Sequence, residues 1–174
     1  MLKMERGTRT ITLPLHDIQQ QIHLHSYYTG NARRESGTPT RTAATIHTSA
    51  DDRRQLENHI DTAISEIIQL INRYMSECRQ TSEEDGANEG YTIVRLHYRA
   101  PYNFPAEANK QMEELITRYT VQRTLHQWLQ QIKPDESIIV ATEVEKTTLQ
   151  IRQAMAVRIR PRRKRKDPDT KIAI

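Results

Sequence analysis

The sequence is poor in the residues on which several classes of function depend. Its 174 residues include one cysteine, five glycines, one phenylalanine and one tryptophan. The single cysteine, Cys78, excludes an internal disulfide, and no Cys/His spacing indicates structural zinc. The few glycines do not form a phosphate-binding or dinucleotide-binding motif. A disulfide-stabilised fold, a zinc module and a nucleotide-binding loop are therefore not expected.

Long hydrophobic runs are also missing. No run approaches the ~18 apolar residues of a membrane span, and the polar residues 1–10 contain no signal-peptide core. We therefore expect no membrane contact and a protein that is made and assembled inside a cell, where the lone cysteine stays reduced.

The composition predicts a narrow core. Hydrophobic residues make up 36% of the chain, aromatic residues 5%, and the mean hydropathy is -0.80. Such a chain fits a mainly α fold, which we expect to be an elongated bundle of three to four helices with a small β-strand or hairpin element and extended terminal arms. We predict a helical body over residues 1–157 and a basic C-terminal arm over residues 158–174.

Two long amphipathic patterns dominate this body. The first predicts a helix over 50–79, and the second predicts a helix over 106–132 after the proline-containing turn at 100–105. The apolar positions of the first helix are Leu56, Ile60, Ile64, Ile67, Ile71, Met75 and Cys78. Those of the second are Ala108, Met112, Leu115, Ile116, Tyr119, either Leu125 or Gln122, Trp128, Leu129 and Ile132. These stripes are expected to form the core.

Weaker patterns predict the remaining helices. One helix is expected over 16–28, ended by Gly30 and Asn31, and another over 136–157, after a turn so short that it must be antiparallel to its predecessor. The apolar face of the last helix is predicted to contain Ile138, Ile139, Thr142 and Leu149, with Met155 or Ala156. This face is weaker than those of the other two long helices.

Alternating polar and apolar residues predict two strands, over 8–15 and 91–99. In the second strand, Val94, Leu96 and Tyr98 share one face with Thr92. Because a two-stranded ribbon alone is marginal in water, the strands are expected to pair over the helices or across subunits. Residues 29–49 and the acidic stretch 80–90 are predicted to be exposed loops.

No combination of residues indicates catalysis. His23 and His25 are the strongest of seven candidates for metal binding, but residues two apart on a helix do not face each other. The acidic groups at 83–85, at 113–114 and at Glu143 and Glu145 are expected to be solvated, since general acid-base chemistry requires convergence on one pocket. Cys78 falls on an apolar helix face and is expected to be buried. We expect no enzyme activity, no cofactor and no metal site.

A basic run at the C-terminus is the most informative segment. Seven of the nine residues from 158 to 166 are cationic, namely Arg158, Arg160, Arg162, Arg163, Lys164, Arg165 and Lys166. From residue 158 onward, eight cationic residues oppose two acids, a net charge of +6, which leaves about -2 for residues 1–157. The candidate binding site is therefore this arm and not the body.

Several targets fit such an arm. It could contact phosphates without reading sequence, because no aromatic residues are interleaved to stack on bases. It could also enter an acidic groove on a partner protein. The run at 161–166 also fits a nuclear-localisation signal, and the whole arm fits a disordered solubilising tail. The sequence leaves all four roles open.

The layout of the chain resembles the head-tail connector proteins, or neck and adaptor ring proteins, of tailed bacteriophages. The resemblance is carried by residues 27–33 (YYTGNAR), Tyr119 leading to residues 125–129 (LHQWL), a short proline turn, and a final helix ending in residues 158–161 (RIRP). It spans most of the chain and is one of layout and a few residues.

This resemblance implies a helical subunit that assembles into a ring, commonly of twelve copies, between the portal and the tail of a virion. It implies that residues 158–166 dock on the portal protein or lie near DNA in the lumen, and that residues 91–99 form an intersubunit strand. The expected location is the virion neck, after assembly in the host bacterial cytoplasm. The alternative is a small, sequence-nonspecific nucleic-acid-binding protein that uses its basic tail.

Overall fold

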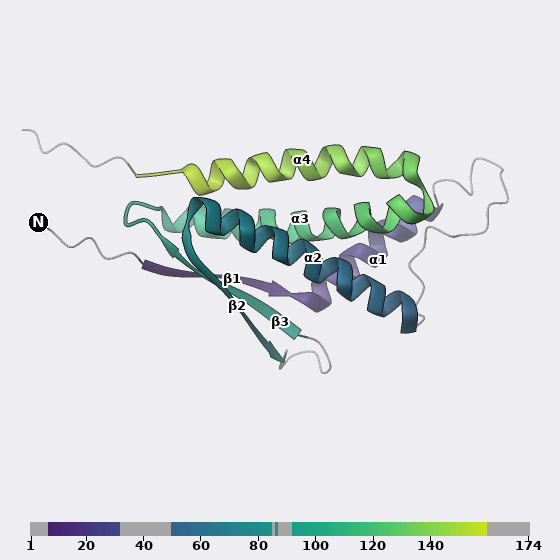
Figure 1. The fold of residues 1–174 in the computed structure, drawn as a ribbon, viewed down its shortest axis with the longest axis horizontal. Helices are drawn as coiled ribbons and strands as arrows, with labels where there is room; N and C mark the ends of the chain where they lie inside the picture. The colour runs from purple at the N-terminus through teal and green to yellow at the C-terminus, as the bar shows by residue number, and fades with distance from the viewer. Residues whose placement is uncertain (1–6, 32–49, 85, 87–91, 160–174) are drawn as a thin grey trace, which may run out of the picture.

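The chain forms a mainly helical fold with a small sheet. The computed structural model describes residues 7–31, 50–84, 86 and 92–159. In chain order, the elements are β1 (Gly7–Pro14), α1 (Leu15–Asn31), α2 (Ala50–Tyr74), β2 (Ser76–Glu84), β3 (Thr92–Ala100), α3 (Ala106–Ile132) and α4 (Pro134–Ala156). The predicted helical class with a minor β element is confirmed (Figure 1).

The sheet is antiparallel, with strand order β1-β3-β2. Ile11 lies opposite Leu96 and Leu13 lies opposite Val94, so β-branched and aliphatic side chains meet on one face. Val94, Leu96 and Tyr98 are buried, as the alternation predicted for β3. The two predicted strands therefore pair with each other within one chain.

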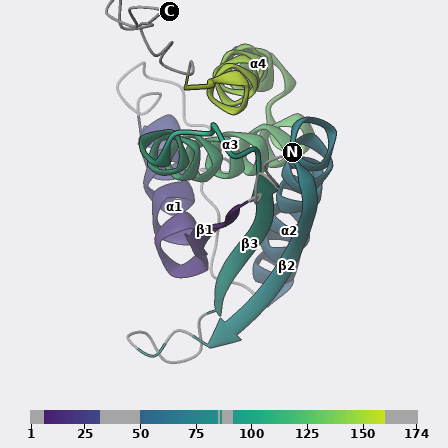
Figure 2. The same ribbon diagram turned by 90° about the vertical axis from the view of Figure 1, so that its left-hand side faces the viewer.

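Helix α3 is the centre of the molecule. It lies between the sheet and α4, with α1 and α2 on either side (Figure 2). Nearly all of its predicted apolar stripe is buried. Two polar contacts fix α3 against the sheet: the Tyr98 hydroxyl donates to Asn109 Oδ1 at 2.7 Å, and Asn109 Nδ2 donates to the Thr10 carbonyl at 3.0 Å.

Helix α2 is shorter than predicted, because a third strand follows it. The stripe from Leu56 to Met75 is buried as expected, but the helix ends at Tyr74. Strand β2 follows at residues 76–84, where we predicted the end of this helix and the start of an acidic loop. Glu77 has a positive φ of 56°, and the register with β3 shifts there, as in a β-bulge. Asn72 Oδ1 accepts a hydrogen bond from the Cys78 backbone N–H at 2.8 Å and so closes this turn.

Helix α1 is longer than predicted. It continues to Asn31, so Gly30 and Asn31 lie inside the helix and do not stop it. The rest of the predicted loop, residues 32–49, lies outside the described residues, as do 85 and 87–91 of the predicted acidic loop.

The predicted inner face of α4 is wrong for most of its residues. Ile138, Ile139, Thr142 and Leu149 are exposed, and Met155 is buried as predicted. The buried residues of α4 are Ser137, Thr147, Ile151, Ala154 and Met155. Val140 and Val144 are partly buried on the same side and pack against the core. At 100° per residue, these positions lie roughly opposite the stripe from Ile138 to Leu149. Helix α4 therefore buries one apolar stripe against α3 and exposes a second, sparser one, in which Thr142, Glu145 and Lys146 separate Ile138 and Ile139 from Leu149.

The described part of the chain ends just after α4, so of the expected basic arm only Arg158 and Ile159 are described. Within the described ranges, no helix is long and apolar enough to cross a membrane.

Candidate functional site

The root of the basic arm is attached to the body. The Arg158 guanidinium donates from Nη1 to the carbonyls of Met155 at 2.5 Å and Val157 at 2.7 Å, where the end of α4 leaves carbonyls without helical partners. The same guanidinium lies 5.9 Å from the centroid of the Phe104 ring. The Ile159 backbone N–H donates to the Asn103 carbonyl at 2.8 Å.

Arg158 therefore differs from the other residues predicted for the arm, since it caps α4 and contacts the turn before α3. The remaining predicted residues, Arg160, Arg162, Arg163, Lys164, Arg165 and Lys166, lie outside the described residues.

The outer stripe of α4 is a second candidate surface. Ile138 is 67% exposed, Ile139 is 68% exposed and Leu149 is 55% exposed. Val157 and Ile159 extend the exposed apolar surface past the end of the helix. Because this stripe lies on the helix farthest from the sheet (Figure 2), another molecule can reach it without rearrangement of the core.

A groove of about 760 Å³ lies between α1, α3 and α4. Its floor contains the apolar side chains of Val121, Leu125 and Leu129, together with Trp128, whose indole N–H has no acceptor among the described residues. The charged residues that line it are Asp17, Glu113, Glu114, Glu143 and Arg118. Four carboxylates thus share the groove with one guanidinium.

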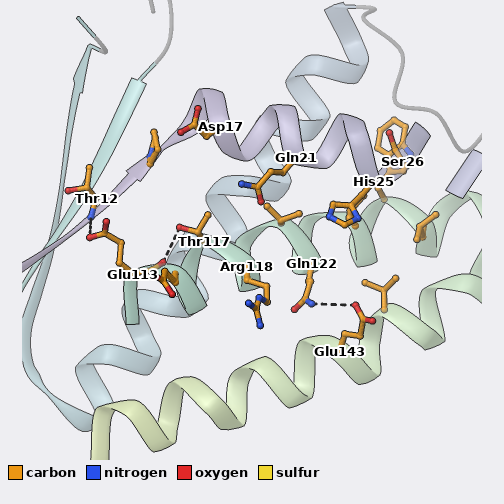
Figure 3. Close-up of a pocket in the computed structure, with 17 residues that line it drawn as sticks. Thr12, Asp17, Gln21, His25, Ser26, Glu113, Thr117, Arg118, Gln122 and Glu143 are labelled. Carbon is orange, nitrogen blue, oxygen red and sulfur yellow. Dashed lines mark hydrogen bonds between the residues drawn. The ribbon is translucent and has the colours of Figure 1, made fainter. Parts of the chain in front are cut away.

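Hydrogen bonds hold two of these carboxylates in place (Figure 3). Glu113 Oε2 accepts from the Thr12 backbone N–H at 3.2 Å, and Glu143 Oε2 accepts from Gln122 Nε2 at 3.3 Å. The Gln122 amide is itself oriented, because its oxygen accepts from the Thr147 hydroxyl at 2.7 Å. An occupant of the groove would therefore meet carboxylates that are already positioned by the strand before α1 and by the contact between α3 and α4.

A second hollow, of about 450 Å³, continues this groove toward the end of α4. It is lined by Gln111, Glu114, Leu115, Arg118, Gln150, Gln153, Ala154 and Val157. Glu114 and Arg118 line both hollows. A depression along α3 thus joins the acidic groove to Val157, beside the root of the arm.

A polar cluster between α2 and α3 lies outside both hollows. Glu66 accepts from the Tyr119 hydroxyl at 2.6 Å and from Arg123 Nε and Nη2 at 2.9 and 2.6 Å, and Arg123 Nη1 lies 3.3 Å from His126 Nδ1. Burial raises the pKa of Glu66, but the hydrogen bonds from Arg123 and Tyr119 outweigh it and leave this pKa below its usual value. Because both Glu66 oxygens accept hydrogen bonds from side chains of α3, the cluster joins the two helices.

The outer face of the sheet is polar. His97 lies between the hydroxyls of Thr10 and Thr81, each 3.0 Å from a ring nitrogen. Arg95 and Glu83 form an ion pair at 2.7 Å across β3 and β2. These polar side chains therefore interact with their cross-strand neighbours on this face.

The described residues contain no group of three or more His, Cys, Asp or Glu that could hold a metal ion. Cys78 is buried, although in β2 and not in a helix, and burial raises the pKa of its thiol to about 11. A thiol of this kind is a poor nucleophile at neutral pH.

The sequence identified the arm but neither the groove nor the outer stripe. Glu114 and Glu143 are exposed, as predicted for these acidic residues, and Glu113 is half-buried. Only the packing of α1 and α4 against α3 places them around one groove with Asp17. Comparison of the chain with models of known protein families, with curated proteins and with solved structures finds no match.

Proposed function

We propose that this protein is a structural subunit of a bacteriophage neck, a head-tail connector that forms a ring, docks on the portal protein and surrounds the DNA channel. The observation that carries the proposal is the outer apolar stripe of α4, represented by Ile138, Ile139 and Leu149, on a helix whose opposite face is already buried. The resemblance of the chain layout to connector proteins suggests that the assembly formed through this stripe is a connector ring.

The stripe has the properties of a subunit interface. Burial of each large aliphatic side chain would contribute about 1.5 to 3 kcal/mol relative to exposure. The loss of translational and rotational freedom on association offsets much of this gain. The stripe therefore favours an assembly of many copies, and a tight isolated dimer is not expected. In a closed ring, every copy would use the same pair of surfaces.

The charge distribution fits a channel. Residues 1–157 have a net charge of about -2, and the positive charge is concentrated in the arm. A mildly acidic body does not grip DNA that must slide past it, whereas a basic arm attached at Asn103 can dock on a neighbouring protein of the neck. In this proposal, the finished assembly is part of the virion and forms in the bacterial cytoplasm.

The mass of the assembly tests the proposal. Light scattering after size-exclusion chromatography, over a range of concentrations and with and without a portal protein, is expected to show ring-sized oligomers. The double substitution Ile138→Ser/Leu149→Ser is expected to abolish them. Its control is Leu24→Ser/Tyr102→Ser, since Leu24 and Tyr102 are 53% and 56% exposed but lie outside the stripe.

A monomer that ignores portal proteins at every concentration would contradict the proposal. Equal loss of assembly in the control variant would show that the stripe has no special part in it.

The alternative function is sequence-nonspecific binding of nucleic acid by the arm, and the run of cations favours it. Arg158 is engaged in the body, so six cations of residues 160–166 remain, and full engagement would give a log-log salt slope of roughly -5. Removal of residues 160–174 would then abolish DNA and RNA affinity. Assembly on a portal without measurable nucleic-acid affinity would exclude this alternative.

A further inference from the structure

We propose that the basic segment of residues 160–166 folds back along α3 and docks in the acidic groove of its own chain. The groove is the one between α1, α3 and α4, with Asp17, Glu113, Glu114 and Glu143 around it. The inference concerns the free subunit and does not depend on the proposed function.

Charge complementarity is the first argument. The segment carries six cations and no acid, and the groove presents four carboxylates against Arg118. Each carboxylate offers about four lone-pair positions, so the bonds that Glu113 and Glu143 accept from Thr12 and Gln122 leave capacity for a guanidinium or an ammonium. Asp17, Glu114 and Glu143 are exposed, so ion pairs between the segment and these carboxylates would weaken as salt rises.

Continuity of the surface is the second argument. The chain leaves the body beside Val157, and Val157 lines the smaller hollow that shares Glu114 and Arg118 with the groove. Arg158 and Ile159 are fastened to the turn before α3, so the arm starts at the end of the depression. A segment that follows the depression meets Glu114 first and the other carboxylates after it.

The length of the segment is the third argument. Glu114 lies about 12 Å along α3 from its first residue, Ala106, and Glu143 lies about 20 Å back along α4 from its last residue, Ala156, at 1.5 Å per helical residue. An extended chain covers about 3.3 Å per residue, so Lys164 is about 17 Å and Lys166 about 23 Å beyond Ile159. The distal cations of the run therefore reach the carboxylates, while the proximal ones lie over the smaller hollow.

The groove also suits a peptide and not a nucleic acid. Its four carboxylates repel phosphates, and its floor of Val121, Leu125 and Leu129 fits the aliphatic stems of lysine and arginine. The indole N–H of Trp128, without an acceptor among the described residues, could donate to a backbone carbonyl of the segment.

Docking would give the arm two states. When the segment occupies the groove, its cations are neutralised and unavailable to a partner or to DNA. A partner must then compete with the groove, so the apparent affinity of the arm falls by the fraction of subunits in the docked state.

Limited proteolysis of the full-length chain tests the docking, because trypsin cleaves after lysine and arginine and the segment is rich in both. Intact-mass spectrometry follows cleavage within residues 160–166 at low salt. The variant Glu114→Lys/Glu143→Lys is expected to be cut about tenfold faster than wild type, as loss of about 1.4 kcal/mol of docking free energy would give. The difference should vanish near 1 M salt, where charges are screened within about 3 Å.

The matched control is Glu107→Lys/Glu145→Lys, which makes the same charge change on the same two helices at exposed positions outside the groove. It is expected to be cut at the wild-type rate. Equal cleavage rates in all three proteins would overturn the proposal.

A disulfide test remains decisive if a charge reversal disturbs folding. Glu143→Cys combined with Lys166→Cys is expected to form an intrachain disulfide under mild oxidation, and Glu145→Cys combined with Lys166→Cys is expected to form it much more slowly. Buried Cys78 remains in both proteins. A predominant interchain product on a non-reducing gel would place the segment in the groove of a second copy and so contradict docking within one chain.

Discussion

The two sides of α3 are built differently. On the side of α1, α2 and the sheet, apolar side chains meet in a closed core, and the Glu66–Arg123 ion pair, with N···O at 2.6 Å, joins α2 to α3. On the side of α4, the apolar contact between α3 and α4 is bordered by an acidic groove, and the far face of α4 is exposed. The first side completes its packing within the chain, whereas the second leaves both an apolar and a charged surface for another segment or molecule.

The largest expected effect is a difference between two buried isoleucines, one on each side. Ile64 on α2 and Ile151 on α4 are both almost fully buried. Ile64→Ala is expected to cost about 4 to 5 kcal/mol and Ile151→Ala about 2 to 3 kcal/mol of unfolding free energy. The cost depends on how far the surroundings can collapse, and α4 packs almost only on α3, whereas α2 packs on both α3 and the sheet. Urea denaturation measures both, and equal costs would show that the α4 side is packed as rigidly as the core.

Removal of the ion pair between α2 and α3 is expected to have the next largest effect. Glu66→Ala leaves Arg123 and the Tyr119 hydroxyl without their acceptor, at a cost of about 1 to 2 kcal/mol after allowance for partial exposure. The control is Glu83→Ala, which breaks the exposed pair with Arg95 and should cost less than about 1 kcal/mol. Equal losses of unfolding free energy in the two variants would show that the Glu66 cluster contributes no more stability than an exposed ion pair.

Two histidines on the closed side make its stability depend on pH. Burial lowers the pKa of His59, and a hydrogen bond to Gln127 opposes this only in part. Burial and the positive charge of Arg123 lower the pKa of His126, and the negative charge of Glu66 opposes this only in part. Folding thus favours the neutral form of both groups. Their contribution to stability is present above the unfolded pKa of about 6.5 and is lost as pH falls through the lower folded values.

The melting temperature is therefore expected to fall between pH 7.5 and pH 5, and His59→Gln/His126→Gln should reduce that fall. The same fall in the variant and in wild type would contradict a role for the two histidines.

The smallest expected effect concerns the outer stripe of α4. Ile138→Ser and Leu149→Ser are each expected to change the unfolding free energy of the dilute protein by less than about 0.5 kcal/mol, since both side chains are already exposed. A cost above about 1 kcal/mol at low concentration would show that the stripe is covered within one chain.

Much of the closed side was predictable from local pattern. The stripes of α2 and α3 recur every three or four residues, and the alternation of β3 correctly placed Val94, Leu96 and Tyr98 inside. These patterns predict burial well because the residues that cover each apolar face belong to the same chain. The spacing of apolar residues then matches the positions that are buried.

The open side was not predictable in the same way. Periodicity favoured the outer face of α4, with Ile138, Ile139 and Leu149. On the buried face, Ser137, Thr147 and Ala154 weaken the apolar signal of Ile151 and Met155. β2 was missed because its sequence, SECRQTSEE, has one buried side chain, Cys78, and its strand form depends on hydrogen bonding to β3. The acidic groove collects residues from β1, α1, α3 and α4, which only the tertiary fold brings together.

The hydrogen bond from Ile159 to Asn103 has a mechanical consequence. Asn103 lies in the turn between β3, the central strand, and α3, the central helix. A pull on the arm therefore reaches the middle of the fold through this single bond as well as through the end of α4. Tension on the arm would be divided between the outermost helix and the turn that joins the sheet to the core.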